Sequence, residues 1–139
     1  MLRPDEVLEN VRRVLASDPH VRWAYVFGSV ARRTAYRDVD VALMPSPTMP
    51  AGGVAWGQRI AALEAAVACK VDLVDLSRAD LPLAGPMLLE RVVVVDREPA
   101  ARHAFEADTT SRWLDFKPCY EEFIRVRALA AARRVQGAK

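Results

Sequence analysis

Near its amino-terminal end, the chain places apolar residues three and four positions apart. Pro4 is followed by two acidic residues, and both features suit the first turn of a helix. The apolar repeat runs from Val7 to Leu15, and the Ser-Asp-Pro sequence at residues 17–19 ends it. This spacing predicts an amphipathic helix that begins near Pro4 and ends before residue 17.

Four later stretches have the composition or the alternation of β-strands. Residues 21–27 (VRWAYVF) are rich in β-branched and aromatic side chains, and residues 38–44 (DVDVALM) alternate strictly at their start. Residues 70–76 (KVDLVDL) and the short apolar run 92–95 (VVVV) complete the set. The pattern therefore predicts four strands.

Between and after the strands, the pattern indicates loops and helices. Residues 45–53 contain three prolines and two glycines and predict a loop that we expect to be mobile, and residues 56–68 predict an alanine-rich helix. A short helix is expected to begin near Leu83. From Pro99 to the end the pattern is helical, with a break or a bend expected near Pro118.

The order of these elements predicts a small α/β (α+β) domain with a mixed sheet of about four strands flanked by helices. We expect the helices to cover mainly one side of the sheet, and Val30 to Arg33 to form the first turn of a short helix. At 139 residues the chain has room for one core. We divide it into a domain at residues 1–97 and a helical carboxy-terminal extension at residues 98–139.

Composition narrows the class of protein. The net charge of +2 gives no electrostatic argument for general nucleic-acid binding. Cys69 and Cys119 are far apart and lie in no metal-binding spacing, so we expect reduced thiols. The amino-terminal segment lacks the apolar core of a signal peptide, and no apolar run approaches the roughly 20 residues of a membrane span. We therefore expect a cytoplasmic protein.

Two short motifs adjoin the first two strands. Gly28 and Ser29 follow the first strand directly, where a backbone rich in free N–H groups can hold phosphate, although an ordinary turn has the same sequence. Asp38 and Asp40 lie two positions apart at the head of the second strand, so both carboxylates project from one face. Carboxylates this close repel each other unless a cation such as Mg²⁺ lies between them. A pair of solvated acids is the alternative.

Asp72 lies within an apolar strand, where an acidic side chain is costly unless it is paired or bound to metal. Alternation places Asp72 and Asp75 on opposite faces of that strand, so at most one of them can join Asp38 and Asp40. A third carboxylate would let two metal ions share ligands, which is an arrangement used in phosphoryl and nucleotidyl transfer.

Three segments in this order carry a family resemblance. They are Phe27-Gly28-Ser29-Val30-Ala31-Arg32, Asp38-Val39-Asp40-Val41 and Val71-Asp72-Leu73-Val74. Together they resemble the DNA polymerase β-like nucleotidyltransferase superfamily, over about residues 5–125. The Gly-Ser-x-Ala-Arg form and the short chain resemble its minimal nucleotidyltransferase (MNT) branch, whose members are often antitoxin partners of HEPN-domain RNase toxins. The segment from Arg112 to Pro118 is similar to the helical extension of those antitoxins.

The resemblance implies a nucleotidyltransferase fold, two Mg²⁺ ions, and ATP as the substrate. It assigns Asp38 and Asp40 as ligands of both ions, and Asp72 as a ligand of the acceptor-side ion and as the general base. It also implies that Gly28 and Ser29 hold the β- and γ-phosphates.

Two arginines next to this motif are further candidates for nucleotide binding. The resemblance places Arg32 near the triphosphate, and Arg33 follows it directly. The family usually has Gly where Arg33 stands and Ser where Arg37 stands, and the stretch between the two motifs is somewhat shorter here. An extra arginine could strengthen nucleotide binding or mark a drifted site. Because the three acids are intact, we favour an active enzyme.

For the antitoxin branch, the resemblance implies transfer of an NMP group, AMP in the case of ATP, to a tyrosine hydroxyl of a cognate HEPN toxin. The alternative is a non-catalytic antitoxin that neutralises its toxin by binding. A small-molecule transferase of the aminoglycoside type is disfavoured, because the chain lacks the larger helical substrate domain of those enzymes.

The tail helix has an apolar side that a small domain covers with difficulty. We predict that it docks on a partner or on a second copy of the chain. Tyr120, Phe123 and Ile124 would be the anchors, and Arg127 would lie at the rim. Packing of this helix on its own sheet is the alternative.

Overall fold

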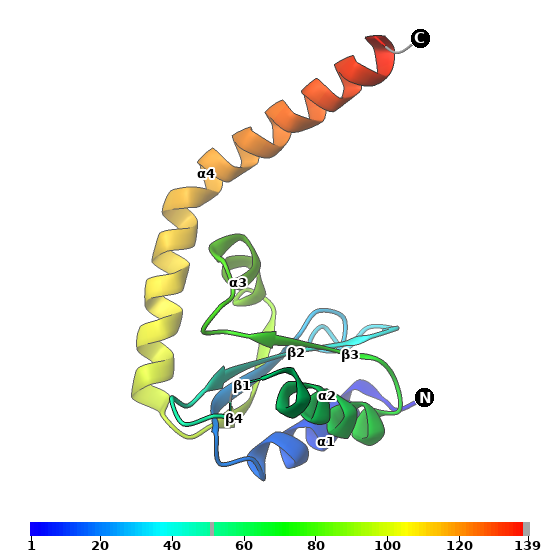
Figure 1. Cartoon of the computed structure of the whole chain (residues 1–139), viewed down its shortest axis with the longest axis vertical. Helices are drawn as coiled ribbons and strands as arrows, with labels where there is room; N and C mark the ends of the chain where they lie inside the picture. The colour runs from blue at the N-terminus through cyan, green and yellow to red at the C-terminus, as the bar shows by residue number, and fades with distance from the viewer. Residues whose placement is uncertain (51, 138–139) are drawn as a thin grey trace.

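A computed structural model describes residues 1–50 and 52–137 of the chain (Figure 1). Ala51 of the predicted loop and the last two residues of the predicted tail helix lie outside the described residues. The elements in chain order are α1 (Pro4–Ala16), β1 (Val21–Phe27), β2 (Val39–Pro45), α2 (Gly53–Val67), β3 (Val71–Asp75), α3 (Leu81–Met87), β4 (Arg91–Asp96) and α4 (Pro99–Gly137). Within the described residues, no helix combines the length and the apolar character needed to cross a membrane.

The four strands form one mixed sheet in the order β3-β2-β1-β4. β1 runs antiparallel to both β2 and β4, whereas β2 and β3 are parallel and are connected through α2. Parallel neighbours need a crossover of this kind, because a tight turn cannot join them. The predicted mixed sheet of about four strands flanked by helices is therefore confirmed.

Helices cover both faces of the sheet, so the expectation of one mainly covered side is wrong. α1 and α2 pack on one face through residues that include Val11 and Leu63. α3 and α4 pack on the other face, where Met87 and Phe105 contact a cluster that includes Trp23 of β1. The physical reason is that alternate residues of β1 are apolar on both faces, and the first half of the tail helix covers the second face.

α3 lies close to α4 because Gly85 has no side chain. A Cβ atom at Gly85 would lie 2.3 Å from Cγ of Trp113. The expected short helix is present, but it begins at Leu81 rather than near Leu83. Pro82 lies in its first turn, where the missing N–H group has no intrahelical partner to lose.

The tail is one helix of 39 residues, and it is not broken at Pro118. It changes direction in its middle part (Figure 1), which agrees with a bend rather than a break. Its first half buries Glu106, Thr109 and Trp113, whereas every described residue from Glu121 onward is exposed. Packing of the whole helix on its own sheet is therefore ruled out, because the second half extends beyond the domain.

Candidate active site

Three strand ends bring predicted site residues together at one edge of the sheet. Phe27, at the end of β1, pairs with Asp40 on β2, and Asp40 pairs with Asp72 on β3. Ala42 and Val74, two positions further along β2 and β3, pack on the face covered by α3 and α4. Because side chains alternate along a strand, Asp40 and Asp72 lie side by side on that same face.

The turn after β1 is built around Gly28. Its φ of +74° lies in the left-handed region, which favours glycine. A Cβ atom at this position would lie 2.4 Å from Oδ2 of Asp40. The turn therefore approaches Asp40 so closely that any side chain at Gly28 would displace the carboxylate.

The segment after Gly28 forms turns, so the short helix expected at residues 30–33 is wrong. The Arg32 amide donates a hydrogen bond to the Gly28 carbonyl oxygen at 3.1 Å, which makes a single helix-like turn. Arg33 then adopts a left-handed backbone with φ of +57°, and the helical path ends there. This is the position where the resembled family usually has Gly, and the backbone conformation gives the physical reason.

The acids of this site repel one another. Burial raises the pKa of Asp40 above its ordinary value, and the charges of Asp72 and Asp38 raise it further, whereas the Arg32 guanidinium opposes them. In the part of the chain that the structure describes, these three carboxylates form no ion pair and accept no side-chain hydrogen bond, and Arg32 is paired with Glu90 instead. The site therefore carries negative charge without a bound counter-charge from the protein.

This set of oxygen ligands fits a hard divalent cation such as Mg²⁺. Among residues 1–50 and 52–137, no three ligating side chains converge into a complete metal-binding cluster. Magnesium does not require one, because it binds through one or two carboxylates and completes its shell with waters and substrate phosphates. Asp40 and Asp72 on adjacent strands, with Asp38 directly before β2, supply carboxylates in that number.

Arg32 connects the turn after β1 to the segment before β4. Its guanidinium donates to Oγ of Ser29 at 3.2 Å and to the carboxylate of Glu90 at 2.5 Å. Glu90, just before β4, also borders a cavity of about 240 Å³ formed by Phe27, Gly28, Pro82, Leu83, Pro86 and Met87. No sequence pattern marks Glu90 as a site residue, because a single acid before an apolar strand resembles any solvated turn residue.

Comparison with known families identifies this arrangement. The family model described as "Polymerase beta, Nucleotidyltransferase" matches residues 9–100, which include every strand and every predicted site residue. The chain belongs to this nucleotidyltransferase family. No curated protein matches the chain significantly.

Solved structures similar to this nucleotidyltransferase support the same fold. One is the tri-AMPylated Shewanella oneidensis HEPN toxin in complex with MNT antitoxin, with 20% identity, a TM-score of 0.70, and coverage of 90% of this chain and 98% of that chain. Another is a toxin–antitoxin structure with AMP-PNP, with 21% identity, a TM-score of 0.69, and coverage of 91% and 99%. At these identities the likeness shows the fold, and the expected nucleotidyltransferase fold is thereby confirmed.

Arg33, which is the other arginine predicted to bind nucleotide, and Arg37, which stands where the resembled family usually has Ser, lie differently from Arg32. Arg33 of this nucleotidyltransferase pairs with Asp5 of α1 at 3.0 Å, in an ion pair that is exposed on both sides. Arg37 is exposed in the segment before β2. The structure therefore brings Arg32 to the acids but directs Arg33 toward α1.

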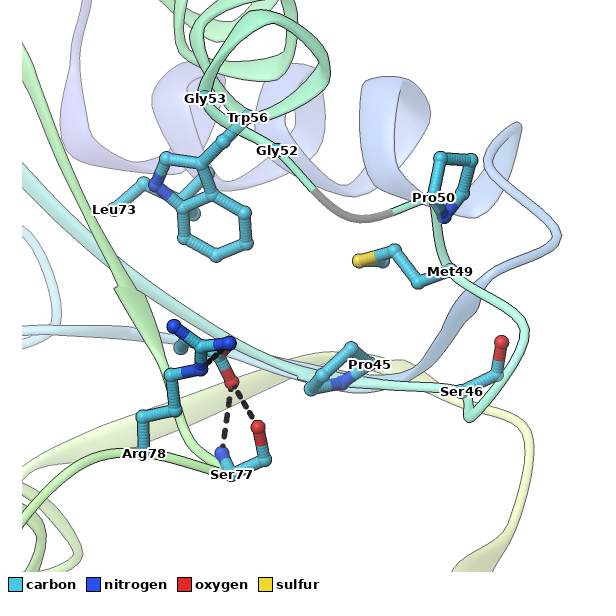
Figure 2. A pocket seen from close by; sticks show the side chains of 11 residues that line it. Pro45, Ser46, Met49, Pro50, Gly52, Gly53, Trp56, Leu73, Ser77 and Arg78 are labelled. Carbon is cyan, nitrogen blue, oxygen red and sulfur yellow. Dashed lines mark hydrogen bonds and ion pairs between the residues drawn. The ribbon is translucent and has the colours of Figure 1, made fainter.

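Asp75 lies on the opposite face of the sheet from Asp72, as the alternation predicts. It borders a cavity of about 590 Å³ with Trp56 of α2 and Leu73 (Figure 2). Its Oδ1 accepts hydrogen bonds from the Ser77 amide at 2.9 Å and from the Ser77 hydroxyl at 2.6 Å. This larger cavity is thus separated from the nucleotidyltransferase acids by the sheet.

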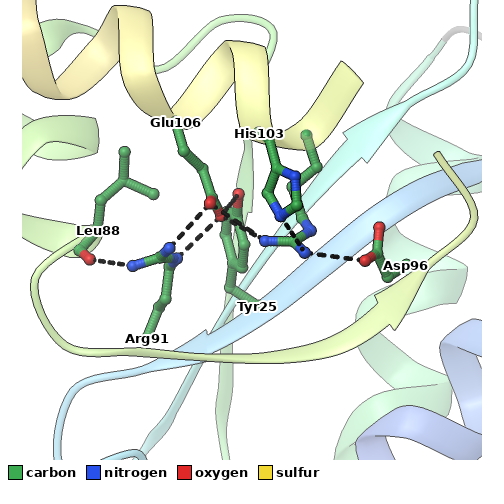
Figure 3. Close-up of polar contacts among 7 residues, drawn as sticks. Tyr25, Leu88, Arg91, Asp96, His103 and Glu106 are labelled. Carbon is green, nitrogen blue, oxygen red and sulfur yellow. Dashed lines mark hydrogen bonds and ion pairs between the residues drawn. The ribbon is translucent and has the colours of Figure 1, made fainter. Parts of the chain in front are cut away.

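A buried polar network joins α4 to the sheet of the nucleotidyltransferase (Figure 3). Glu106 accepts a hydrogen bond from the Tyr25 hydroxyl at 2.7 Å, two from Arg91 at 2.9 and 2.8 Å, and two from Arg102 at 3.1 Å. Burial alone would raise the pKa of Glu106, but hydrogen bonds from Arg91, Tyr25 and Arg102 outweigh it and lower that pKa. The network fixes the first half of α4.

Proposed function

We propose that this chain is a metal-dependent nucleotidyltransferase that moves AMP from ATP to a hydroxyl group of a partner protein. The observation that carries the proposal is the pair of adjacent, uncompensated carboxylates of Asp40 and Asp72 beside the tight Gly28 turn. Membership of the nucleotidyltransferase family supports this reaction class.

The Gly28 turn and its neighbours would bind the triphosphate. The turn has no side chain at Gly28, so phosphate oxygens can approach its backbone closely. Ser29 and Arg32 add a hydroxyl and a guanidinium, which is suited to bidentate contact with phosphate. Arg32 would exchange its contact with Glu90 for one with the ligand.

The three acids would hold the metal and receive the proton. Asp38, Asp40 and Asp72 would bind up to two Mg²⁺ ions, which when bound would stabilise negative charge on the phosphates. In the transfer, the acceptor oxygen forms a bond to the α-phosphorus, and the bond to the β-phosphate oxygen breaks to release pyrophosphate. Asp72, which is exposed, would accept the proton of the acceptor hydroxyl.

We infer that the acceptor is a tyrosine of a HEPN-type RNase toxin. One similar structure is an AMPylated HEPN toxin in complex with an MNT antitoxin, and another contains AMP-PNP, a non-hydrolysable ATP analogue. The same partner class in both the sequence resemblance and the similar structures supports this choice of acceptor.

The second candidate function is an antitoxin that neutralises its toxin by contact alone. Two observations favour it. Arg33 stands in left-handed backbone where the resembled family usually has Gly, and Arg32 is already paired with Glu90. Both features are compatible with a site that has lost its substrate.

A transfer assay distinguishes the two functions. The chain is incubated with Mg²⁺ and a HEPN-type protein as the candidate partner, in parallel with ATP labelled at the α- or the γ-phosphate. We expect label on the partner from α-labelled ATP only, and no label when the acceptor tyrosine is changed to phenylalanine. Inhibition of the partner's RNase activity without transfer of label would instead establish the second function.

A further inference from the structure

In the second half of α4, every described residue from Glu121 to Gly137 is exposed. We call residues 118–137 the arm, and they extend over about 30 Å at the helical rise per residue. Two of its apolar side chains, Phe123 and Ile124, are 55% and 46% exposed. A solvated helix of this composition is unusual unless another surface covers it.

The arm continues a face of α4 that is already used for packing. Trp113 is buried against Gly85 of α3, and its ring lies 5.7 Å from that of Tyr120 between centroids. Tyr120 and Ile124 follow Trp113 by seven and eleven positions, so they lie on the same side of the helix. This apolar face therefore begins inside the domain and continues into the arm as far as Ile124.

The arm lies on the side of the sheet that carries the acids. Figure 1 shows the arm leaning across the side of the sheet on which α3 lies. Asp40 and Asp72 lie on that same side. A protein seated against the inner side of the arm would therefore lie on the side of the sheet where its hydroxyl group can reach the site.

The charges of the arm indicate what kind of surface covers it. Its two glutamates are engaged within the helix, by Arg125 and by Lys117 just before the arm. The remaining arginines of the arm have no carboxylate partner within the described residues. They are Arg127, Arg133 and Arg134. Arg127 lies over the ring of Phe123 at 5.5 Å. A second copy would present the same unpaired arginines, whereas an acidic surface would complement them.

We infer that one face of the arm, marked by Tyr120, Phe123 and Ile124, is the docking surface for the protein acceptor, which binds it through an apolar groove with acidic residues at its rim. This inference rests on the proposed function, since it takes the acceptor to be a protein. The apolar face supplies affinity, and the arginines orient the acceptor so that its hydroxyl group reaches Asp72.

The test compares two matched glutamate substitutions in the full chain. Ile124→Glu lies on the apolar face, and Leu129→Glu lies about 140° away around the helix at nearly equal exposure. The probe is the same HEPN-type protein that serves as the candidate partner in the transfer assay, and its affinity is measured by calorimetry together with KM and kcat for transfer. We expect Ile124→Glu to weaken binding and raise KM at least tenfold with kcat unchanged, and Leu129→Glu to have less than a threefold effect.

Three outcomes would overturn the inference or separate it from the proposed function. If both variants transfer AMP and bind the partner with equal affinity, the assignment of the arm as the docking surface is wrong, and the proposed function is unaffected. If only Ile124→Glu loses partner binding and the wild-type chain transfers no AMP, the result supports the arm as the docking surface and contradicts the proposed catalytic function. A dimer of the chain alone that Ile124→Glu dissociates, with partner affinity unchanged, would assign the arm to a second copy.

Discussion

Two acidic regions lie on the same side of the sheet, and only one of them is neutralised by basic side chains of the protein. Glu106 on α4 is buried and receives five hydrogen bonds from a tyrosine and two arginines, and its pKa is lowered. Asp40 on β2 is half-buried beside two other acids, has no ion pair among the described residues, and its pKa is raised. The first carboxylate is neutralised by the protein, and the second is not.

The difference separates an acid that stabilises the fold from acids that the proposed function assigns to ligand binding. A neutralised buried carboxylate holds elements together, because removing either partner leaves an uncompensated charge. Carboxylates that repel one another destabilise the fold, and they are retained where a ligand supplies the missing charge. Glu106 therefore fixes α4, whereas under the proposed function Asp40 and its neighbours would bind a cation together with the nucleotide.

Removing the central unpaired acid has the largest expected effect. Asp40→Asn should lower transfer by about a thousandfold or more, because loss of one charged ligand costs several kcal/mol of transition-state stabilisation. The melting temperature of the ligand-free protein should stay equal or rise, since a repelling charge is removed. Wild-type turnover by the purified Asp40→Asn protein would contradict the assignment of Asp40 to the active site.

The two acids of β3 give the next largest contrast. Asp72→Asn should lower kcat by about a hundredfold, because Asp72 pairs with Asp40 in register. Asp75→Asn should change kcat by less than about threefold, because Asp75 faces the other side and bonds Ser77. The comparison is made on purified variants at saturating ATP. Equal losses would mean that the alternation on β3 does not separate their roles.

Removing the neutralised acid should act on stability. Glu106→Gln leaves Arg91 and Arg102 without their shared carboxylate, and we expect a loss of about 3 kcal/mol in the free energy of unfolding. Urea denaturation of both proteins measures this difference. Tyr25→Phe is the matched control, because it removes one neutral donor to the same carboxylate and should cost only about 1 kcal/mol. An unchanged midpoint in Glu106→Gln would contradict the structural role.

The same network predicts a smaller dependence on pH. Because the pKa of Glu106 is lowered in the folded protein, its contribution is present above the unfolded value of about 4.3 and is lost as pH falls through the folded value. The melting-temperature gap between wild type and Glu106→Gln should therefore narrow by about 3 °C between pH 6 and pH 3. Calorimetry at several pH values tests this, and a gap that widens in acid would have the wrong sign.

The parts of the fold and site that are local in sequence were predictable. Alternation identified the strands, and it placed Asp72 and Asp75 on opposite faces, as the structure has them. The resemblance named the Gly28 turn, and the structure adds the reason, since a side chain there would meet Asp40.

What could not be predicted depends on contacts between distant residues. Tyr25 and Glu106 are 81 positions apart, and Arg32 and Glu90 are 58 positions apart, so no local pattern links them. The prediction that helices cover mainly one face of the sheet was wrong for the same reason, because the first half of α4, which packs on the second face, is distant in sequence from most of the sheet. The prediction of a helix at residues 30–33 was wrong because Arg33 adopts a left-handed backbone conformation. Arginine rarely adopts this conformation, so the sequence does not indicate it.

Binding of a metal ion with nucleotide tests the contrast between the two acidic regions most directly. Mn²⁺ replaces Mg²⁺ in a titration with AMP-PNP, and electron paramagnetic resonance measures free Mn²⁺ for wild type, Asp40→Asn and Glu106→Gln at a temperature where all three are folded. We predict that wild type and Glu106→Gln bind Mn²⁺ with the nucleotide equally well, and that Asp40→Asn does not. Equal binding by Asp40→Asn, or no binding by the wild type, would contradict the assignment of the unpaired acids as a cation site.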